Sequence, residues 1–302
     1  IFGEGQGNFP QNTQDLNQDN ADLLPDVAVG RVPVSSVAEL QTYVGKVIRY
    51  ENSASADWFQ NVLLVTGDYP GSNGTNDAIG TDLSGQGFAL DKKYHDAVWP
   101  ATTIQQRWAI IENALNAGVG FISYVGHGSG AGAGKDGGAW GGWYDYARIP
   151  NLSNADHLPV IFSAACETGM FHFGNGPYFA KQGHVYDTPV TPPKYRWSPE
   201  PISYSPSGYD KDTLAEHFLV KRKEGGIAFI GAYTGTQGDS HTLARGFFSS
   251  YAAGDHVLGD AWNGSLTTFI NGPIAALSFP GSSWYTYARW SHINKMLLFG
   301  DP

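Results

Sequence analysis

The chain has 302 residues, of which 41% are hydrophobic and 14% aromatic, so it is long enough to bury a large core in one or two domains. Its formal net charge of -10 argues against nucleic acids and anionic membrane surfaces as partners and mildly favours basic substrates. No apolar run reaches the roughly 18 residues needed to span a bilayer, and the single Cys excludes an internal disulfide framework. The chain opens on Ile1 without Met or a recognisable signal peptide, so we expect a processed form or an excised piece.

The first 26 residues form an acidic, polar lead-in that contains one pattern typical of a calcium loop. Asp15, Asn17 and Asp19 place oxygen side chains at alternate positions, and Asp26 stands at the twelfth place counted from Asp15. Asn20 replaces the usual Gly, the last acid is Asp instead of Glu, and no helix pattern flanks the segment. The pattern is compatible with a structural Ca2+ site and with a solvated acidic loop, and both interpretations remain. No cofactor is expected for the chemistry itself.

Strand and helix patterns alternate through the first 117 residues. Ser35 or Ser36 can cap a helix together with Glu39, and apolar residues at helical spacing follow as far as Ile48. A turn-rich loop is expected at 71–77, between a strand and a weak helix. The predicted elements are strands at 27–32 and 61–66, an edge strand at 92–95, and helices at 78–88 and 101–117.

Two further apolar runs, 118–125 and 158–165, are typical of strands buried on both faces of a parallel sheet. The first runs into a glycine-bearing turn with His127, and the second ends on Cys166. Because ligands bind at the carboxyl ends of parallel strands, both side chains are expected at one edge of the sheet. A thiol needs a base or a cation beside it to become a thiolate near neutral pH. Each residue alone is typical of a structural Cys or a loop His, but the pair favours catalysis.

The remaining chain continues the α/β alternation after a long irregular insertion at 174–210. A segment of that length in a compact domain is usually a lid or a binding loop. A helix at 213–224 and a buried strand at 227–232 follow, and then helices at 241–253, 256–270 and 282–297. This order predicts a single domain over 1–302, with a mostly parallel sheet covered by helices on both faces.

A glycine-rich stretch at 129–136 resembles a phosphate-binding loop without matching it. Ser129 stands where the first Gly is required, and Asp136 stands where a hydroxyl should bind magnesium. A carboxylate at that place repels a triphosphate, which argues against nucleotide hydrolysis.

The residues around the Cys and the His resemble a known peptidase group. The run Ala-Ala-Cys-Glu-Thr-Gly at 164–169 is similar to the caspase signature, with the His upstream on the preceding strand. The motifs at 124–129 (YVGHGS) and 158–166 (LPVIFSAAC) resemble the gingipain family of bacterial cysteine peptidases, and the likeness extends to 25–31, 226–232 and 299–302. The resemblance implies a caspase-like three-layer α/β fold with a mostly parallel central sheet.

The resemblance also implies catalytic roles. Cys166 is expected to be the nucleophile and His127 the general base and acid. The backbone N–H groups of Gly128 and Cys166 are expected to form the oxyanion hole. Asp68 stands where the arginine-specific relatives carry a glutamate that orients the histidine.

The resemblance also implies a substrate preference. Asp77 matches the acid that binds a substrate arginine in the family, although a helix amino-terminal cap is the alternative for this residue. Asp239 is a second candidate, in a pocket loop with Ser240, near which the tryptophan wall of the relatives is missing. We expect a protein or peptide to be cleaved after Arg or Lys by an enzyme that is secreted or on the bacterial surface. A processing transpeptidase of exported proteins and an inactive binding protein remain alternatives.

Overall fold

The computed structural model describes residues 24–53, 57–129, 140–171, 212–233, 235–236, 238–272, 293 and 295–302, and the backbone of 185–187 and 194–196. The chain divides into two units, 24–171 with 212–302 and 1–23 with 172–211. Of the latter, the structure describes an antiparallel pair, β5 (Val185–Asp187) and β6 (Lys194–Arg196). The expectation of a single domain stays a prediction, and the fold below is that of the former unit.

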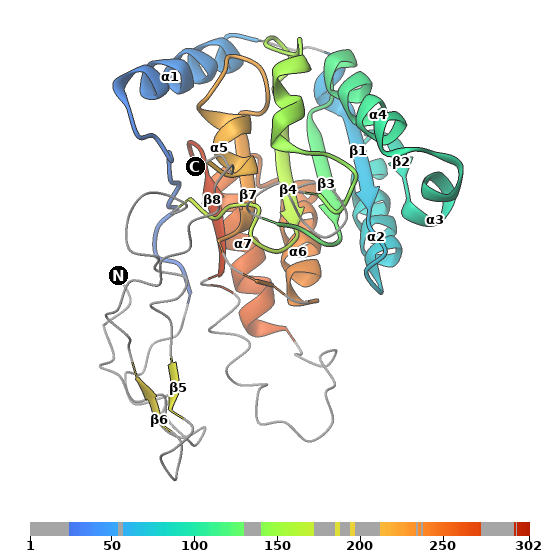
Figure 1. Cartoon of the computed structure of the whole chain (residues 1–302). Helices are drawn as coiled ribbons and strands as arrows, with labels where there is room; N and C mark the ends of the chain where they lie inside the picture. Colours follow the sequence, from blue (N-terminus) through green and yellow to red (C-terminus); the bar gives the residue numbers. More distant parts are fainter. Residues whose placement is uncertain are drawn as a thin grey trace. The chain divides into compact units, whose positions relative to one another are not determined.

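A six-stranded sheet in the order β2-β1-β3-β4-β7-β8 forms the middle layer (Figure 1). All neighbouring strands are parallel except β7 and β8, so the predicted mostly parallel α/β sheet is confirmed. Thr66 pairs with Val125 and Val125 with Ala164, so β1, β3 and β4 end at one level. The strands are β1 (Asn61–Thr66), β2 (Ala89–Lys93), β3 (Phe121–Val125), β4 (Val160–Ala164), β7 (Ala228–Ala232) and β8 (Met296–Phe299).

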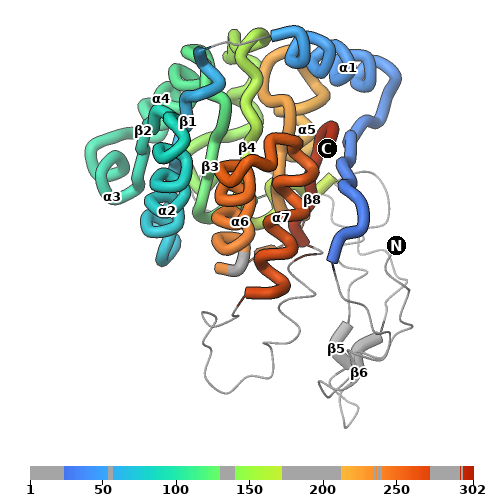
Figure 2. The backbone as a smooth tube through the Cα atoms, turned by 180° about the vertical axis from the view of Figure 1, so that it is seen from behind, coloured from blue at the N-terminus to red at the C-terminus, as the bar shows by residue number. Residues whose placement is uncertain are grey.

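Helices cover both faces of this sheet. Figure 2 shows one layer in front of the strands, made of α2 (Ser72–Ser84), α6 (Asp239–Ala253) and α7 (Leu258–Asn271). The opposite layer contains α1 (Val37–Glu51), α4 (Ile104–Ala117) and α5 (Leu214–Leu219). Short elements complete the unit: η2 (Asp57–Gln60), α3 (His95–Val98), η3 (Trp99–Ala101) and η4 (Tyr146–Asn151). Among the described residues, no helix combines the length and the apolar character that a membrane span requires.

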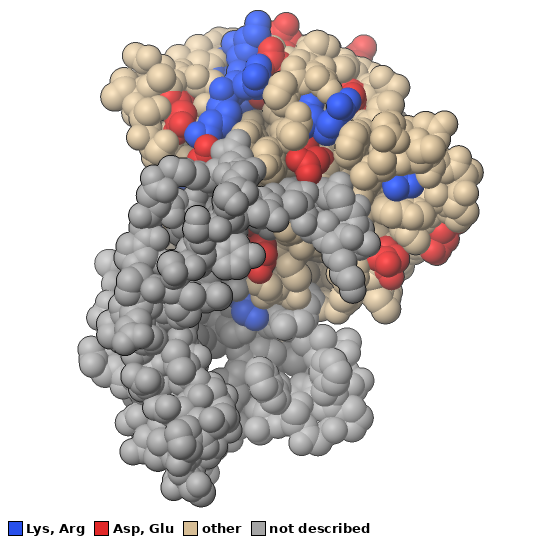
Figure 3. Space-filling model, viewed as in Figure 1, with Lys and Arg blue, Asp and Glu red and all other residues tan. Residues whose placement is uncertain are grey.

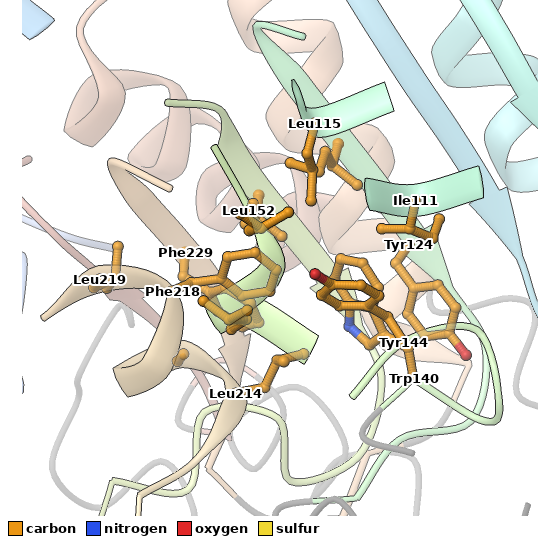
Figure 4. Close-up of a cluster of buried hydrophobic side chains, with 14 of the residues drawn as sticks. Ile111, Leu115, Tyr124, Trp140, Tyr144, Leu152, Leu214, Phe218, Leu219 and Phe229 are labelled. Atoms are coloured by element: carbon orange, nitrogen blue, oxygen red, sulfur yellow. The ribbon is translucent and has the colours of Figure 1, made fainter. Parts of the chain in front are cut away.

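The core between the sheet and this second helix layer is aromatic (Figure 4). Trp140 and Tyr144, from the connection between β3 and β4, are fully buried beside Phe218 of α5 and Phe229 of β7. Large rings bury much apolar area for few fixed torsions, so they stabilise this layer strongly. The connection after His127 therefore belongs to the core rather than to the surface.

Helix α2 begins at Ser72, so it includes the stretch that we expected to be a turn-rich loop. The side chain of Asn76, in the middle of that stretch, is bonded to the sheet instead of to its own backbone. Asn76 donates to the Val65 carbonyl oxygen at 2.9 Å and accepts from Ser123 Oγ at 2.7 Å. Asn and Ser favour loops because they bond to nearby backbone, and these tertiary bonds remove that competition.

The outer edge of the sheet also differs from the expectation. Residues 27–32 form no strand but one parallel bridge, from Arg31 to Phe299. The helix expected at 282–297 lies mostly outside the described residues, and Met296 already belongs to strand β8. Short apolar runs cannot be assigned to strand or helix by periodicity alone, and here pairing with β7 decides. The helix expected at 213–224 ends at Leu219.

Helix α1 has the expected bounds but turns its polar face to the protein. Lys46 is fully buried, and its Nζ donates to the carbonyl oxygens of Phe218 at 2.6 Å and Gly226 at 3.2 Å. Tyr43 is also buried and donates to the Ile227 carbonyl oxygen. The apolar stripe of the same helix is exposed: Val37, Leu40, Val44 and Ile48. Hydrogen bonds therefore do much of the anchoring of α1.

Ion pairs add to this attachment. Lys221 Nζ lies 2.7 Å from Glu39 Oε1 of α1 and 2.7 Å from Asp212 Oδ2 before α5. Figure 3 shows basic and acidic side chains interleaved in this part of the molecule, over α1 and α5. Mixed charges of this kind stabilise only modestly where solvent reaches them.

Lys46 makes the stability of the fold depend on pH. Burial lowers the pKa of Lys46 from 10.5 to about 7. Between these values the unfolded chain holds a proton that the folded chain has lost, so stability rises as pH increases from 7 towards 10.5. We expect a slope of about 1.4 kcal/mol per pH unit in the free energy of unfolding, which Lys46→Met should lack. Urea denaturation across this window measures it, with exposed Lys223→Met as the control. Equal slopes in wild type and Lys46→Met would contradict the prediction.

Candidate active site

Loops that follow the carboxyl ends of β1, β3, β4 and β7 meet around one pocket. The structure brings His127 and Cys166 together there, at the sheet edge where the sequence places them. No acidic residue lines the pocket in the described part of the chain. The lining residues are Tyr69, Gly126, His127, Ala164, Cys166, Thr236, Ser240 and His241.

The histidine loop and the cysteine loop touch through Gly128. A Cβ at this position would lie 2.5 Å from the Cys166 carbonyl oxygen and 2.7 Å from the Ala165 Cβ, so only glycine fits. Within the described residues, the backbone N–H groups of Gly128 and Cys166 donate to no protein acceptor. Two unengaged N–H groups on adjoining loops can together bind an oxyanion.

Cys166 is partly exposed and sits against the loop that follows β7. Its Sγ lies 3.3 Å from both the N–H nitrogen and the carbonyl oxygen of Thr236. A thiol can donate to the carbonyl, and a thiolate can accept from the N–H. Glu167, the next residue, has a positive φ of 61°. No other non-glycine residue that the structure describes has a positive φ. This left-handed turn costs about 1–2 kcal/mol and occurs directly beside Cys166.

Asp68 is the carboxylate nearest to the histidine among the described ion pairs. Its Oδ1 lies 3.6 Å from His127 Nε2, and both side chains are more than half exposed. This distance exceeds that of a good hydrogen bond, so the contact is loose and contributes little stability. The main chain of His127 is held more firmly, because Tyr124 donates its hydroxyl to the His127 carbonyl oxygen at 2.7 Å.

A second histidine enters the pocket from the first turn of α6. His241 Nδ1 lies 3.2 Å from Thr75 Oγ1, which donates its own proton to the Gly71 carbonyl oxygen. The Thr75 oxygen therefore accepts from His241, which places the proton of the neutral imidazole on Nδ1. Tyr69 stands edge-on to both histidines, with its ring centroid 5.5 Å from that of His127 and 5.3 Å from that of His241.

Residues 6–302 match the family model described as Peptidase family C25. The chain belongs to this family. Gingipain R2 of Porphyromonas gingivalis is 29% identical over 172 residues, which are 53% of this chain and 21% of the relative. An uncharacterized protein of Archaeoglobus fulgidus is 26% identical over 253 residues, 74% of this chain and 50% of the relative. The C25 chain thus spans half or less of the length of these curated relatives.

Solved structures show the same fold. The crystal structure of the Arg specific cysteine proteinase gingipain R matches with a TM-score of 0.63 and 16% identity, over 93% of this chain and 55% of that chain. The complex of the Porphyromonas gingivalis RgpB pro- and mature domains matches with a TM-score of 0.64 and 18% identity. The caspase-like α/β fold that the sequence predicts for this C25 chain is therefore confirmed.

Asp77, expected as an arginine ligand, lies outside this pocket. It bonds to Lys92 Nζ at 2.6 Å and Tyr94 Oη at 2.8 Å, and these partners hold the pKa of its carboxyl below the usual range. Residues two apart on a helix point about 200° apart. Because Thr75 contacts His241 in the pocket, Asp77 faces the other side of α2.

The other predicted ligands of the C25 chain are partly described. Ser240 is buried and lines the pocket, whereas Asp239 begins α6 with a side chain outside the described part. The calcium candidates Asp15, Asn17 and Asp19 lie outside the described residues, and Asp26 is exposed. Within the described residues, no group of three or more His, Cys, Asp or Glu could hold a metal ion. Calcium binding stays a prediction.

Sequence reasoning missed three pocket residues. Tyr69 follows Asp68 after β1, His241 follows Ser240, and Thr236 lies in the predicted pocket loop. Each stands just beyond the carboxyl end of a parallel strand or at the start of the next helix. The rule that ligands bind at this edge could have included them.

Gly128→Ala should disable the site. Its added Cβ meets the Cys166 carbonyl oxygen, a backbone atom that cannot swing aside as a flexible side chain can. We expect peptide turnover to fall by about 100-fold and the free energy of unfolding by about 1–3 kcal/mol. Turnover assays and urea denaturation measure both. Gly45→Ala is the matched control, because its Cβ meets nothing within 4 Å and should slightly stabilise α1. Wild-type turnover in Gly128→Ala would contradict this.

Proposed function

We propose that this C25 chain is a cysteine endopeptidase with Cys166 as nucleophile and His127 as general base and acid. The observation that carries the proposal is the pocket in which these two residues meet beside the adjoining N–H groups of Gly128 and Cys166. Membership in a family of cysteine peptidases supports the same chemistry. Substrates are then proteins or peptides.

The proposed reaction forms an acyl-thioester. His127 takes the thiol proton, and Cys166 Sγ attacks the carbonyl carbon of the scissile bond to form the S–C bond. The carbonyl oxygen becomes an oxyanion, which the N–H groups of Gly128 and Cys166 stabilise. His127 returns the proton to the amine as the C–N bond breaks. Water, deprotonated by His127, then attacks the acyl carbon and releases the acid and the thiol.

Asp68 has the supporting role in this scheme. With His127 Nε2 directed towards the Asp68 carboxylate, Nδ1 is the ring nitrogen left to exchange protons with Cys166. A contact of 3.6 Å can shorten when substrate binds, as such contacts often do in enzymes. Asp68 therefore orients the imidazole and stabilises its charged form.

Labelling with a thiol-reactive peptide probe tests the chemistry. Because Cys166 is the only cysteine, a covalent adduct identifies it without ambiguity. We expect Cys166→Ala to abolish labelling and turnover, and His127→Ala to lower turnover by about 10²–10⁴-fold with the thermal midpoint unchanged. A wild-type protein that takes no label and cleaves no peptide would be an inactive binding protein instead. Product masses separate hydrolysis from transpeptidation, since the latter yields an amide in place of an acid.

We further propose cleavage after Arg or Lys, with Asp239 as the recognising acid. Asp239 directly precedes Ser240 and His241, which line the pocket, while Asp77 is already engaged by Lys92. The net charge of -10 and the similarity to an Arg specific proteinase agree with a basic substrate.

A peptide library cleaved by two matched variants tests this preference. Asp239→Asn should lower kcat/KM for Arg and Lys substrates by about 30- to 5,000-fold, the equivalent of about 2–5 kcal/mol for a truncated charge pair. Asp77→Asn should change it little. The reverse result would reassign the acid to Asp77. Equal cleavage after Arg, Lys, Ala and Phe by the wild type would remove the proposal.

The compartment also remains a proposal. Resemblance to gingipains suggests a secreted or cell-surface enzyme, and a single cysteine is compatible with either. Fractionation of cells that express the full protein tests it, because intact protein found only in the cytosol would rule out export.

A further inference from the structure

A short segment crosses the carboxyl ends of the central strands beneath the site. It consists of Trp140, Gly141, Gly142 and Trp143, and we call it the tryptophan bracket. Two backbone hydrogen bonds close it, from Trp140 N–H to the Tyr144 carbonyl oxygen at 3.0 Å and from Trp143 N–H to the Trp140 carbonyl oxygen at 2.6 Å. Both tryptophan side chains are fully buried. A buried indole N–H needs an acceptor, and the two acceptors lie on different strands.

Those acceptors stand on either side of β3. Trp143 donates to the carbonyl oxygen of Thr66, the last residue of β1, at 2.9 Å. Trp140 donates to the hydroxyl of Ser163, near the end of β4, at 3.0 Å. Because β3 lies between β1 and β4, the bracket spans three of the four strands that lead into the site.

On the cysteine side, a buried hydrogen-bond chain continues from the bracket. Ser163 Oγ lies 3.0 Å from Thr168 Oγ1, and Thr168 follows Cys166 by two residues. Both hydroxyl residues are fully buried. An indole N–H can only donate, so Ser163 accepts from Trp140 and can donate its own proton to Thr168. These hydrogen bonds thereby connect the bracket to the loop that carries Cys166.

On the histidine side, the bracket contacts the loop through Tyr124. The rings of Trp140 and Tyr124 are stacked, with centroids 4.8 Å apart and planes 16° apart (Figure 4). Tyr124 donates its hydroxyl to the His127 carbonyl oxygen. Gly141, at φ 40°, approaches so closely that a Cβ there would lie 3.3 Å from that same oxygen. The bracket therefore packs on the main chain of the histidine.

We propose that the tryptophan bracket positions His127 relative to Cys166, an inference that rests on the proposed peptidase site. Trp140 meets both loops at once, through its N–H on the cysteine side and through its ring on the histidine side. Proton transfer requires the two groups to lie within hydrogen-bond reach of each other. A displacement of about 1 Å from a remote change can lower the rate by about 100-fold. Trp140 is thus a positioning residue that touches no reacting atom.

Trp140→Phe isolates the hydrogen bond, because it keeps a ring against Tyr124 and removes the N–H. Alkylation by iodoacetamide reports on Cys166 alone and needs no peptidase turnover. We would measure its rate against pH for the wild type, Trp140→Phe and His127→Ala. The pH dependence of the alkylation rate in Trp140→Phe should differ from that of the wild type and lie closer to that of His127→Ala. With a peptide substrate, kcat should fall by about 10- to 100-fold and KM should change little.

Two sets of controls separate positioning from general destabilisation. Trp262→Phe alters an equally large buried ring on α7, packed on Phe162 on the other face of the sheet, and should leave the profile unchanged. Thr168→Val breaks the hydrogen-bond chain at its far end, whereas Thr168→Ser keeps the hydroxyl. Thr168→Val should resemble Trp140→Phe, and the double variant should be no worse than either single one. The Thr168 pair decides the matter if Trp140→Phe does not fold.

Several results would overturn the proposal. The proposal fails if the alkylation rate of Trp140→Phe or Thr168→Val depends on pH as that of the wild type does. It also fails if Trp262→Phe changes this pH dependence as much as Trp140→Phe does. No effect of His127→Ala on alkylation would show that the two loops are not coupled, which also overturns it. Failure of the wild type to cleave any peptide would refute the proposed function instead, and the alkylation comparison would still stand.

Discussion

The parallel pairing of β1, β3 and β4 is the constraint on which the site depends. These strands end level with one another, so the residues that follow them must share one edge of the sheet. Asp68, His127 and Cys166 come from three distant stretches of sequence and meet only because of this register. Nearly all side chains of these strands are buried, on both faces of the sheet, between the two helix layers. The final adjustment is steric, because Gly128 lets two loops touch where any Cβ would separate them.

Buried polar groups supply alignment that apolar packing alone does not. Asn76 links α2 to β1 and β3, Lys46 links α1 to α5 and the turn after it, and Trp140 links the β3–β4 connection to β4. A buried donor must find an acceptor at a defined distance and direction, or it loses about 1–3 kcal/mol. Apolar contacts tolerate sliding, whereas these bonds do not. These hydrogen bonds occur in the core close to the loops of His127 and Cys166, and at α1, the helix whose apolar face is exposed.

The sequence predicted the strands that end at His127 and Cys166 because each is a continuous apolar run with glycines beside it. It failed where tertiary contacts override local preference. Asn76 and its neighbours look like a loop, but bonds to the sheet make them the first turns of α2. A motif gives the sequence position of Asp77 but not the direction in which its side chain leaves the helix. Its contact with Lys92 could therefore not be predicted from the sequence. His241 carried no motif and is recognised as a pocket residue only through Thr75 and Tyr69.

The reaction and the specificity that we propose therefore rest on different parts of the fold. His127 and Cys166 follow strand ends, which the sheet holds rigidly, whereas Ser240 and His241 of the pocket wall come from the first turn of α6, beside Thr75 of α2. A helix that starts one residue earlier or later rotates its side chains by about 100°. Such a rotation can direct the carboxylate of an acidic residue away from a substrate cation and towards a protein cation such as Lys92. Cys166 and His127 are not disturbed by it. Family membership thus supports a shared reaction much more firmly than a shared substrate.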